Sequence, residues 1–178
     1  MTVTHCLTAQ ILTEDFERLF LENYDLVYRA AYSITGNPQD AEDVLQTLFL
    51  RLLQRENPVQ VEKNPRGYLY RAAVHTAIDA VRTRSHAESL ISSTVLSERT
   101  AGIPEDKRSS EIWEWLHKAL AKLHPKEAEV FLLRHIEGYS NVEVAHLLGV
   151  SRGTVAVTLF RARVRLKRSI RRHFGDSL

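Results

Sequence analysis

Apolar side chains recur every three or four residues in the first third of the chain, the spacing of one face of an α-helix. The pattern begins near Phe16 and stops at Gly36-Asn37-Pro38, where turn-forming residues follow. A second pattern runs from Asp40 to about Arg55, and a third follows Asn64-Pro65 and continues to about Arg84. The sequence therefore predicts three consecutive helices in this part of the chain.

Periodicity fades over residues 86–110, where Ser, Thr, Glu and Gly are frequent, and we expect a flexible linker there. Helical spacing returns near Ile112 and continues through Pro125 to His135, and two more helices are expected after Gly138 and Gly149. The predicted fold is all-α, with two small helical domains, residues 10–85 and 111–178, joined by the linker.

The composition supports this fold and excludes several classes of protein. Seven Gly and five Pro supply little of the turn chemistry that β-hairpins need. A single cysteine, Cys6, excludes an internal disulfide framework and a Cys-rich zinc site. No stretch approaches the roughly 18 apolar residues of a membrane span, and we see no export signal. We expect a cytoplasmic protein without membrane insertion, metal or cofactor.

Charge is segregated along the chain although the formal net charge is only +2. The start is acidic, with Glu14, Asp15, Glu17, Glu22, Asp25, Asp40, Glu42 and Asp43. The end is basic, with Arg161, Arg163, Arg165, Lys167, Arg168, Arg171 and Arg172. This asymmetry predicts that the end of the chain binds a polyanion and that the start binds something else.

The last two predicted helices have the spacing of a helix-turn-helix motif. Ala145 would let the helices approach, Gly149 would take the turn, and Val155 would fill the core between them. Ser151 is a good N-cap for the second helix. Four residues of that helix would face inward: Val155, Leu159, Ala162 and Leu166.

The opposite face of the same helix is both basic and apolar. It carries Val157, Phe160, Arg161, Val164, Arg168 and Arg171. Arginine pairs with guanine edges or phosphates, and valine or phenylalanine can contact thymine methyl groups, so this face suits the DNA major groove. A solvated basic helix end is the alternative.

The second predicted helix has more apolar residues than one surface stripe requires. If Val44, Leu48 and Leu52 form its inward row, the far side carries four residues beside Asp40 and Asp43, namely Gln46, Phe49, Leu50 and Leu53. That far side is typical of a protein-docking patch. The alternative is a central helix of a three-helix bundle, buried on two sides.

The third predicted helix carries an aromatic residue and basic residues on one face. Tyr68, Arg71, His75 and Arg82 lie there, and Ala72, Ala73, Thr76, Ala77 and Ala80 lie opposite. Aromatic rings that stack on bases, beside arginines that neutralise phosphates, commonly hold single-stranded or melted DNA. Taken alone, Tyr68 would more often be a half-buried core residue.

Three strings of residues, in this order, resemble the extracytoplasmic-function sigma factors of the sigma-70 family. The strings are Asp40-Ala41-Glu42-Asp43-Val44 with Gln46 and Phe49; Pro65-Arg66-Gly67-Tyr68-Leu69 through Asp79 and Arg82; and Glu137-Gly138-Tyr139-Ser140 through Leu148-Gly149-Val150-Ser151 and Gly153-Thr154-Val155 to Arg161-Ala162-Arg163. The resemblance covers nearly the whole chain. It implies an alternative sigma factor that binds core RNA polymerase, through the β′ clamp helices and the β flap, and promoter DNA, and that is controlled by an anti-sigma factor.

The resemblance also implies roles for residues. The polymerase-binding set is Asp40, Glu42, Asp43, Gln46, Phe49, Leu50 and Leu53, and the set for the promoter's −10 element is Tyr68, Arg71, His75, Asp79 and Arg82. The set for the −35 element is Ser151, Arg152, Thr154, Val157, Phe160, Arg161, Arg163 and Arg168. His75 stands where the family often has Asn, and Ala156, Val157 and Thr158 depart from its usual pattern, so promoter preference is expected to differ.

Two other classes of function would use parts of the same sequence. A helix-turn-helix regulator that acts without replacing sigma would need a sensing first half, but this half shows no doubly wound α/β pattern. A nuclease could use Asp40, Glu42, Asp43 and His75 to hold a metal, but these carboxylates lie where a helix start favours them. We therefore expect no enzyme activity.

Overall fold

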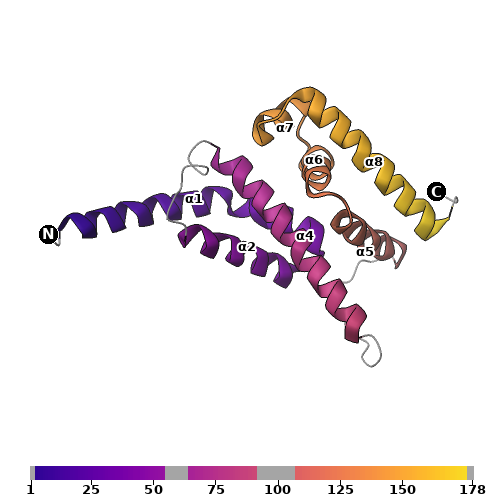
Figure 1. The fold of residues 1–178 in the computed structure, drawn as a ribbon, viewed down its shortest axis with the longest axis horizontal. Helices are drawn as coiled ribbons and strands as arrows, with labels where there is room; N and C mark the ends of the chain where they lie inside the picture. The colour runs from indigo at the N-terminus through magenta and orange to yellow at the C-terminus, as the bar shows by residue number, and fades with distance from the viewer. Residues whose placement is uncertain (1–2, 55–63, 92–106, 176–178) are drawn as a thin grey trace.

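The described part of the chain is built of helices joined by short turns. The structure is a computed structural model that describes residues 3–54, 64–91 and 107–175, and these residues form seven helices and no strand (Figure 1). The helices are α1 (Val3–Thr35), α2 (Pro38–Leu53), α4 (Pro65–Ile91), α5 (Lys107–Ala121), α6 (Pro125–His135), α7 (Asn141–Leu148) and α8 (Arg152–Phe174). The predicted all-α fold is confirmed.

Helices continue further than hydrophobic periodicity predicts. Helix α1 starts at Val3, well before Phe16, and α4 runs past Arg84 to Ile91. Helix α5 already starts at Lys107, so the predicted linker of residues 86–110 is helical at both ends, and its middle lies outside the described residues. Ala, Glu and Leu in the last turns of α4 have high helix propensity, which sustains a helix without an apolar stripe.

The junction between α1 and α2 is fixed by local chemistry. Gly36 adopts φ = 65°, a left-handed conformation that ends α1 and that other residues rarely accept. Asn37 caps α2, because its side-chain oxygen accepts the N–H groups of Gln39 at 2.8 Å and Asp40 at 3.3 Å. Pro38 occupies the first turn, where its missing N–H costs nothing. The two helices therefore turn sharply and pack together.

The first half of the chain, α1, α2 and α4, packs as a three-helix unit. Its fully buried residues include Val27 and Ile34 of α1 and Val74 and Ile78 of α4. Of the small residues predicted to face inward on α4, Ala73 and Ala77 are fully buried, Ala72 and Thr76 are half-buried, and Ala80 is exposed. Small side chains let α4 approach α1 closely.

The second half, α5 to α8, has its core between α6, α7 and α8. Leu133, Val144, Val155 and Ala162 are fully buried there. The two halves also pack on each other: α4 contacts α5, α6 and α7, and α1 contacts α5. Figure 1 shows α4 between the rest of the first half and the second half. The N-terminal helices therefore form a docking surface for the C-terminal ones.

The length and the apolar character of a helix decide whether it can cross a membrane. None of the helices in the described residues is, by itself, long and apolar enough to cross a membrane. Helices α7 and α8 satisfy the length and composition requirement only as a pair, and they are bent by 106° relative to each other.

Candidate nucleic-acid and polymerase interfaces

Helices α7 and α8 form the predicted helix-turn-helix geometry. Gly149 ends α7 with φ = 63°, the left-handed conformation that the turn requires. Ala145 is buried between the two helices, and Val155 is fully buried behind the turn. Ser151 caps α8 by accepting the backbone N–H of Thr154 at 3.0 Å, and the two hydroxyl groups lie 2.9 Å apart. The motif therefore holds α8 at a fixed angle in front of α7.

The face of α8 that points away from the core is the predicted one. Leu159, Ala162 and Leu166 are buried as expected, whereas Phe160 is 68% exposed and Val157 is 52% exposed. The exposed set also includes Arg152, Arg161, Arg163, Val164 and Arg168. We refer to Val157, Phe160, Arg161, Val164 and Arg168 as the α8 stripe. It presents large apolar groups and guanidinium groups together to solvent.

Arg163 is oriented by a neighbouring histidine. Its guanidinium group lies 3.2 Å from Nε2 of His135, at the end of α6. Partial burial, with Arg163 and Arg134 close by, lowers the pKa of His135 and favours the neutral ring. A neutral ring nitrogen can accept the Arg163 hydrogen bond, which a protonated ring could not do. The arginine is thereby held at the edge of the α8 stripe.

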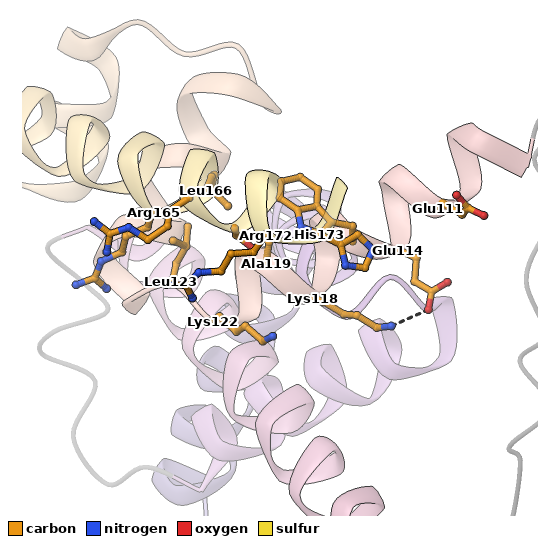
Figure 2. Close-up of a pocket in the computed structure, with 13 residues that line it drawn as sticks. Glu111, Glu114, Lys118, Ala119, Lys122, Leu123, Arg165, Leu166, Arg172 and His173 are labelled. Carbon is orange, nitrogen blue, oxygen red and sulfur yellow. Dashed lines mark hydrogen bonds and ion pairs between the residues drawn. The ribbon is translucent and has the colours of Figure 1, made fainter. Parts of the chain in front are cut away.

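A pocket of about 780 Å³ lies between α5 and the second half of α8. It is lined by Glu111, Glu114, Trp115, Lys118, Ala119, Lys122, Leu123, Arg165, Leu166, Arg168, Ser169, Arg172 and His173. Figure 2 shows Lys118 paired with Glu114, at 2.8 Å, while Lys122 and Arg172 extend into the same opening. No sequence pattern predicts this pocket, because its walls come from two helices that are distant in the sequence.

Metal binding has no support in the described ranges. No group of three His, Cys, Asp or Glu side chains among them is arranged to hold a metal ion. Asp40, one of the carboxylates weighed for that role, forms an ion pair with Arg84 of α4 instead. Glu42 and Asp43 are exposed in the first turns of α2.

The predicted docking patch on α2 needs one correction. Leu50 and Leu53 are 48% and 59% exposed, and Gln46 is exposed, as expected. Phe49 was expected on the same side, but it is 4% exposed and packs edge-on against Phe20 of α1, with ring centroids 4.6 Å apart. Helix α2 contacts both α1 and α4, so its buried arc is wider than one stripe. For Phe49, the alternative of a helix buried on two sides is correct.

The face of α4 predicted to bind melted DNA is assembled, and its charged residues hydrogen-bond to the second half of the chain while they remain exposed. Arg71 donates from Nη1 to the carbonyl of Leu148 at 3.4 Å, and Nε2 of His75 lies 2.8 Å from Oε1 of Glu129. The Arg82 guanidinium donates to the carbonyls of Ala121 and Leu123, at 3.1 and 2.9 Å. We refer to Arg71, His75 and Arg82 as the α4 stripe.

The other two residues of this predicted set lie beside the stripe. Asp79 is exposed on α4. Tyr68 is half-buried and packs against the hydrophobic core. The structure therefore supports the alternative reading of Tyr68 as a half-buried residue, with part of its side chain still accessible.

Glu129 is a functional candidate that sequence reasoning missed. It is 3% exposed on α6, and burial raises the pKa of its carboxyl group while the hydrogen bond from His75 opposes that rise. A sequence signal existed, since Glu129 stands four residues before buried Leu133, in a row that faces the inside of α6. A charged residue in such a row indicates a specific partner.

Two family models match this chain. Sigma-70 region 2 matches residues 19–87, and Sigma-70, region 4 matches residues 113–166. The first range includes α2 and most of α4, and the second includes α6, α7 and most of α8. Together they cover more than half of the chain.

Relatives and solved structures agree with these matches. The RNA polymerase sigma-E factor of Streptomyces coelicolor is 32% identical, over 88% of this chain and 86% of that protein. The ECF RNA polymerase sigma factor SigE of Mycolicibacterium smegmatis is 31% identical, over 94% of this chain and 66% of that protein. The fold is similar to that of the sigma factor RpoE, solved with the anti-sigma factor NepR from Bartonella quintana (TM-score 0.51, 22% identity, 89% of this chain and 98% of that one). It is also similar to CnrH, solved with the cytosolic domain of CnrY (TM-score 0.53, 23% identity, 93% and 91%).

The matched regions follow the order of the sequence motifs, and the helix-turn-helix with its exposed α8 stripe falls within region 4. The chain therefore belongs to the sigma-70 family and is an alternative sigma factor of the extracytoplasmic-function group.

Proposed function

We propose that this chain binds core RNA polymerase and directs it to promoters through two DNA-binding helices, α4 for the melted −10 element and α8 for the −35 element. The exposed α8 stripe on a helix-turn-helix is the observation that carries the proposal. The units that act are residues 10–85 and 111–178. The chain would act in the cytoplasm, where the polymerase works, and would catalyse no reaction itself.

The proposed −35 contacts divide by chemistry. Arg161 lies on the exposed side of α8 and is suited to a bidentate contact with a guanine edge. Phe160 and Val157 would contact thymine methyl groups. Arg152, Arg163 and Arg168 would bind phosphates and so fix the register of the helix, while Ser151 and Thr154 hold its first turn, where N–H groups attract a phosphate.

The proposed polymerase contact uses the exposed side of α2. Leu50 and Leu53 form its apolar part, and Glu42, Asp43 and Gln46 surround them with acidic and polar groups. Phe49 supports this surface from inside by packing on Phe20. Basic or apolar surfaces such as those expected of the β′ clamp helices fit this arrangement, and the β flap is the proposed contact of the second unit.

We also propose an anti-sigma factor as a regulatory partner. Two solved structures with a similar fold are complexes: the sigma factor RpoE with the anti-sigma factor NepR, and CnrH with the cytosolic domain of CnrY. Such a partner would bind the surfaces that polymerase and DNA need.

Transcription in vitro with core RNA polymerase, followed by sequencing of the RNA 5′ ends, tests the proposal. New start sites that share −10 and −35 sequences are expected only when the chain is added. A footprint far upstream of start sites, formed without polymerase, would instead favour a helix-turn-helix regulator that does not replace sigma.

The polymerase contact has its own test. Replacing Leu50 and Leu53 together by Lys should abolish co-purification with core polymerase and leave the helical circular dichroism spectrum unchanged. Leu21→Lys is the matched control, because Leu21 is 66% exposed on α1, outside the proposed patch. Retained co-purification of the double variant would remove α2 from the proposed interface.

A further inference from the structure

The pocket between α5 and the second half of α8 is basic, and part of its positive charge is not used within the chain. Two of its cations are paired, Lys118 with Glu114 at 2.8 Å and Arg165 with Glu127 at 3.1 Å. Three further cations line the pocket and form no side-chain ion pair within the described ranges: Lys122, Arg168 and Arg172. The pocket therefore favours a ligand that carries several negative charges.

Lys122 and Arg172 reach the pocket from the two helices that form its walls. Lys122 directly follows the end of α5, and Arg172 lies in the last turn of α8. Figure 2 shows both side chains extending into the same opening. Both residues are exposed, so their charged groups remain accessible to a ligand. Cations on separate helices can hold one phosphate chain between them, because guanidinium and ammonium groups both bind phosphate oxygens.

The same pocket has an apolar and aromatic part. Its lining includes the buried residues Ala119, Leu123 and Leu166 and the half-buried Trp115. Phe174 packs edge-on against the Trp115 ring, with ring centroids 5.9 Å apart, which fixes the orientation of the indole. The indole N–H group is buried and has no hydrogen-bond partner within the described ranges. Such a ring can stack on a flat heterocycle, and its N–H group lacks an acceptor that a ligand would supply.

We propose that this pocket binds a nucleoside polyphosphate, with the base stacked on Trp115 and the phosphates held by the three cations that form no ion pair. The volume of about 780 Å³ lies within the range of small-molecule sites, roughly 300–1,000 Å³. An acidic peptide would neutralise the same cations, but it would gain nothing from the aromatic ring. Of the proposed contact residues, only Arg168 also belongs to the α8 stripe.

Isothermal titration calorimetry of the full chain, with ATP and GTP as probes, tests the site at physiological ionic strength, where exposed charges are screened. We expect saturable binding at a single site. Inorganic triphosphate carries the phosphates without the base, and it should bind about tenfold more weakly because stacking on the aromatic ring is lost. AMP should also bind more weakly than ATP, because it offers fewer charges to the cations.

Two double variants distinguish the pocket from the general positive charge of the chain. Lys122→Gln with Arg172→Gln should weaken ATP binding about tenfold or more, because two charged contacts to phosphate are lost. Arg51→Gln with Lys167→Gln is the matched control, since it also removes one lysine and one arginine, both exposed and both outside the pocket lining. The control should bind ATP like the wild type. Arg168 is kept in both variants, so the α8 stripe is unchanged, and circular dichroism confirms that each variant is folded.

The aromatic contact has a readout of its own. The chain has two tryptophans, and Trp113 is 53% exposed, so Trp113→Phe leaves Trp115 as the only tryptophan with little effect on packing. Stacking of a base on the indole should quench the fluorescence of Trp115 as ATP is added, with the same midpoint as the calorimetric titration. Inorganic triphosphate has no ring to stack and should leave the fluorescence unchanged.

Several results would overturn the inference. Without saturable binding of ATP or GTP there is no nucleotide site, and equal affinities for ATP, triphosphate and a glutamate peptide of similar charge would show only a basic surface. Equal losses in the two double variants would place the binding outside the pocket. If Lys122→Gln with Arg172→Gln weakens binding of duplex DNA while free nucleotides do not bind, these cations belong to the DNA surface. Failure of the proposed function is separate, because it would appear as absent promoter-specific transcription whether or not the chain binds ATP.

Discussion

Helices α4 and α8 carry similar surfaces in different surroundings. Both present arginines on one side with an aromatic residue close by, Tyr68 on α4 and Phe160 on α8. The α8 stripe faces solvent, whereas Arg71, His75 and Arg82 of the α4 stripe all contact the second half of the chain. All three residues also remain exposed. Helical spacing thus predicts which residues share a face, and tertiary packing decides which of them already have hydrogen-bond partners within the chain.

The first prediction separates the inner and outer sides of α8. Leu159→Ala, at a buried position, should destabilise the chain by about 2–4 kcal/mol, because it leaves a cavity. Phe160→Ala, one residue further but exposed, should change stability by less than about 0.5 kcal/mol and still reduce transcription several-fold. Urea unfolding and transcription in vitro provide the two readouts. Equal stability losses would mean that the α8 stripe is not an exposed surface.

The second prediction concerns sequence readout by α8. Arg161→Ala should remove about 1–3 kcal/mol of discrimination at one −35 base pair, because a bidentate contact to a base is lost. Arg171→Ala, nearer the end of α8, should weaken all promoters alike and lower the salt dependence by about one counterion. Transcription across single-base promoter variants distinguishes the two. A uniform loss for Arg161→Ala would assign that residue to the DNA backbone.

The third prediction concerns the buried side of α4. Tyr70 of α4 is fully buried, and its hydroxyl group has no hydrogen-bond partner within the described ranges. Burial, then the nearby carboxylates of Glu137 and Glu129, raises the pKa of that hydroxyl. Tyr70→Phe should therefore stabilise the chain by about 1 kcal/mol in urea unfolding. Tyr32→Phe, at an exposed ring, is the control, and a destabilising Tyr70→Phe would reveal a hydrogen bond to the hydroxyl.

The fourth prediction concerns the first helix of the helix-turn-helix. The backbone N–H of Ser140 donates to Glu143 at 2.7 Å and, with the Ser140 hydroxyl, lowers the pKa of Glu143 from its ordinary value of 4.5. A lowered carboxyl pKa stabilises the folded chain above pH 4.5, and that contribution is lost as the pH falls through the folded pKa. Glu143→Gln should reduce the loss of stability in this acid range slightly. Identical acid profiles for both proteins would argue against the capping contact.

Local features were predictable because neighbouring residues determine them. Helix α6, Pro125–His135, was predictable because it begins at a proline and its apolar residues recur every three or four positions. The buried residues of α8 follow from the 3.6-residue repeat of the helix. The cap at Ser151 and the turn at Gly149 depend on residues within one helical turn. These features carry most of the predicted −35 surface.

Long-range features were not predictable from a single sequence. The His75 to Glu129 contact joins α4 to α6 across the predicted linker, and no local pattern relates the two residues. The prediction that Phe49 is exposed was wrong. Its burial depends on how α1 and α4 flank α2, which the sequence of α2 alone does not reveal. The last turns of α4 were predicted to be linker because they lack an apolar stripe. They are helical because their residues have high helix propensity.

The most direct measurement is transcription in vitro with core RNA polymerase on promoters whose −35 positions are varied one at a time, with and without the chain. If the α8 stripe reads the −35 element, start sites should appear only when the chain is added, and Arg161→Ala should lose its preference at one −35 base pair. Start sites that form without the chain, or a base preference that Arg161→Ala leaves unchanged, would contradict the proposed role of α8.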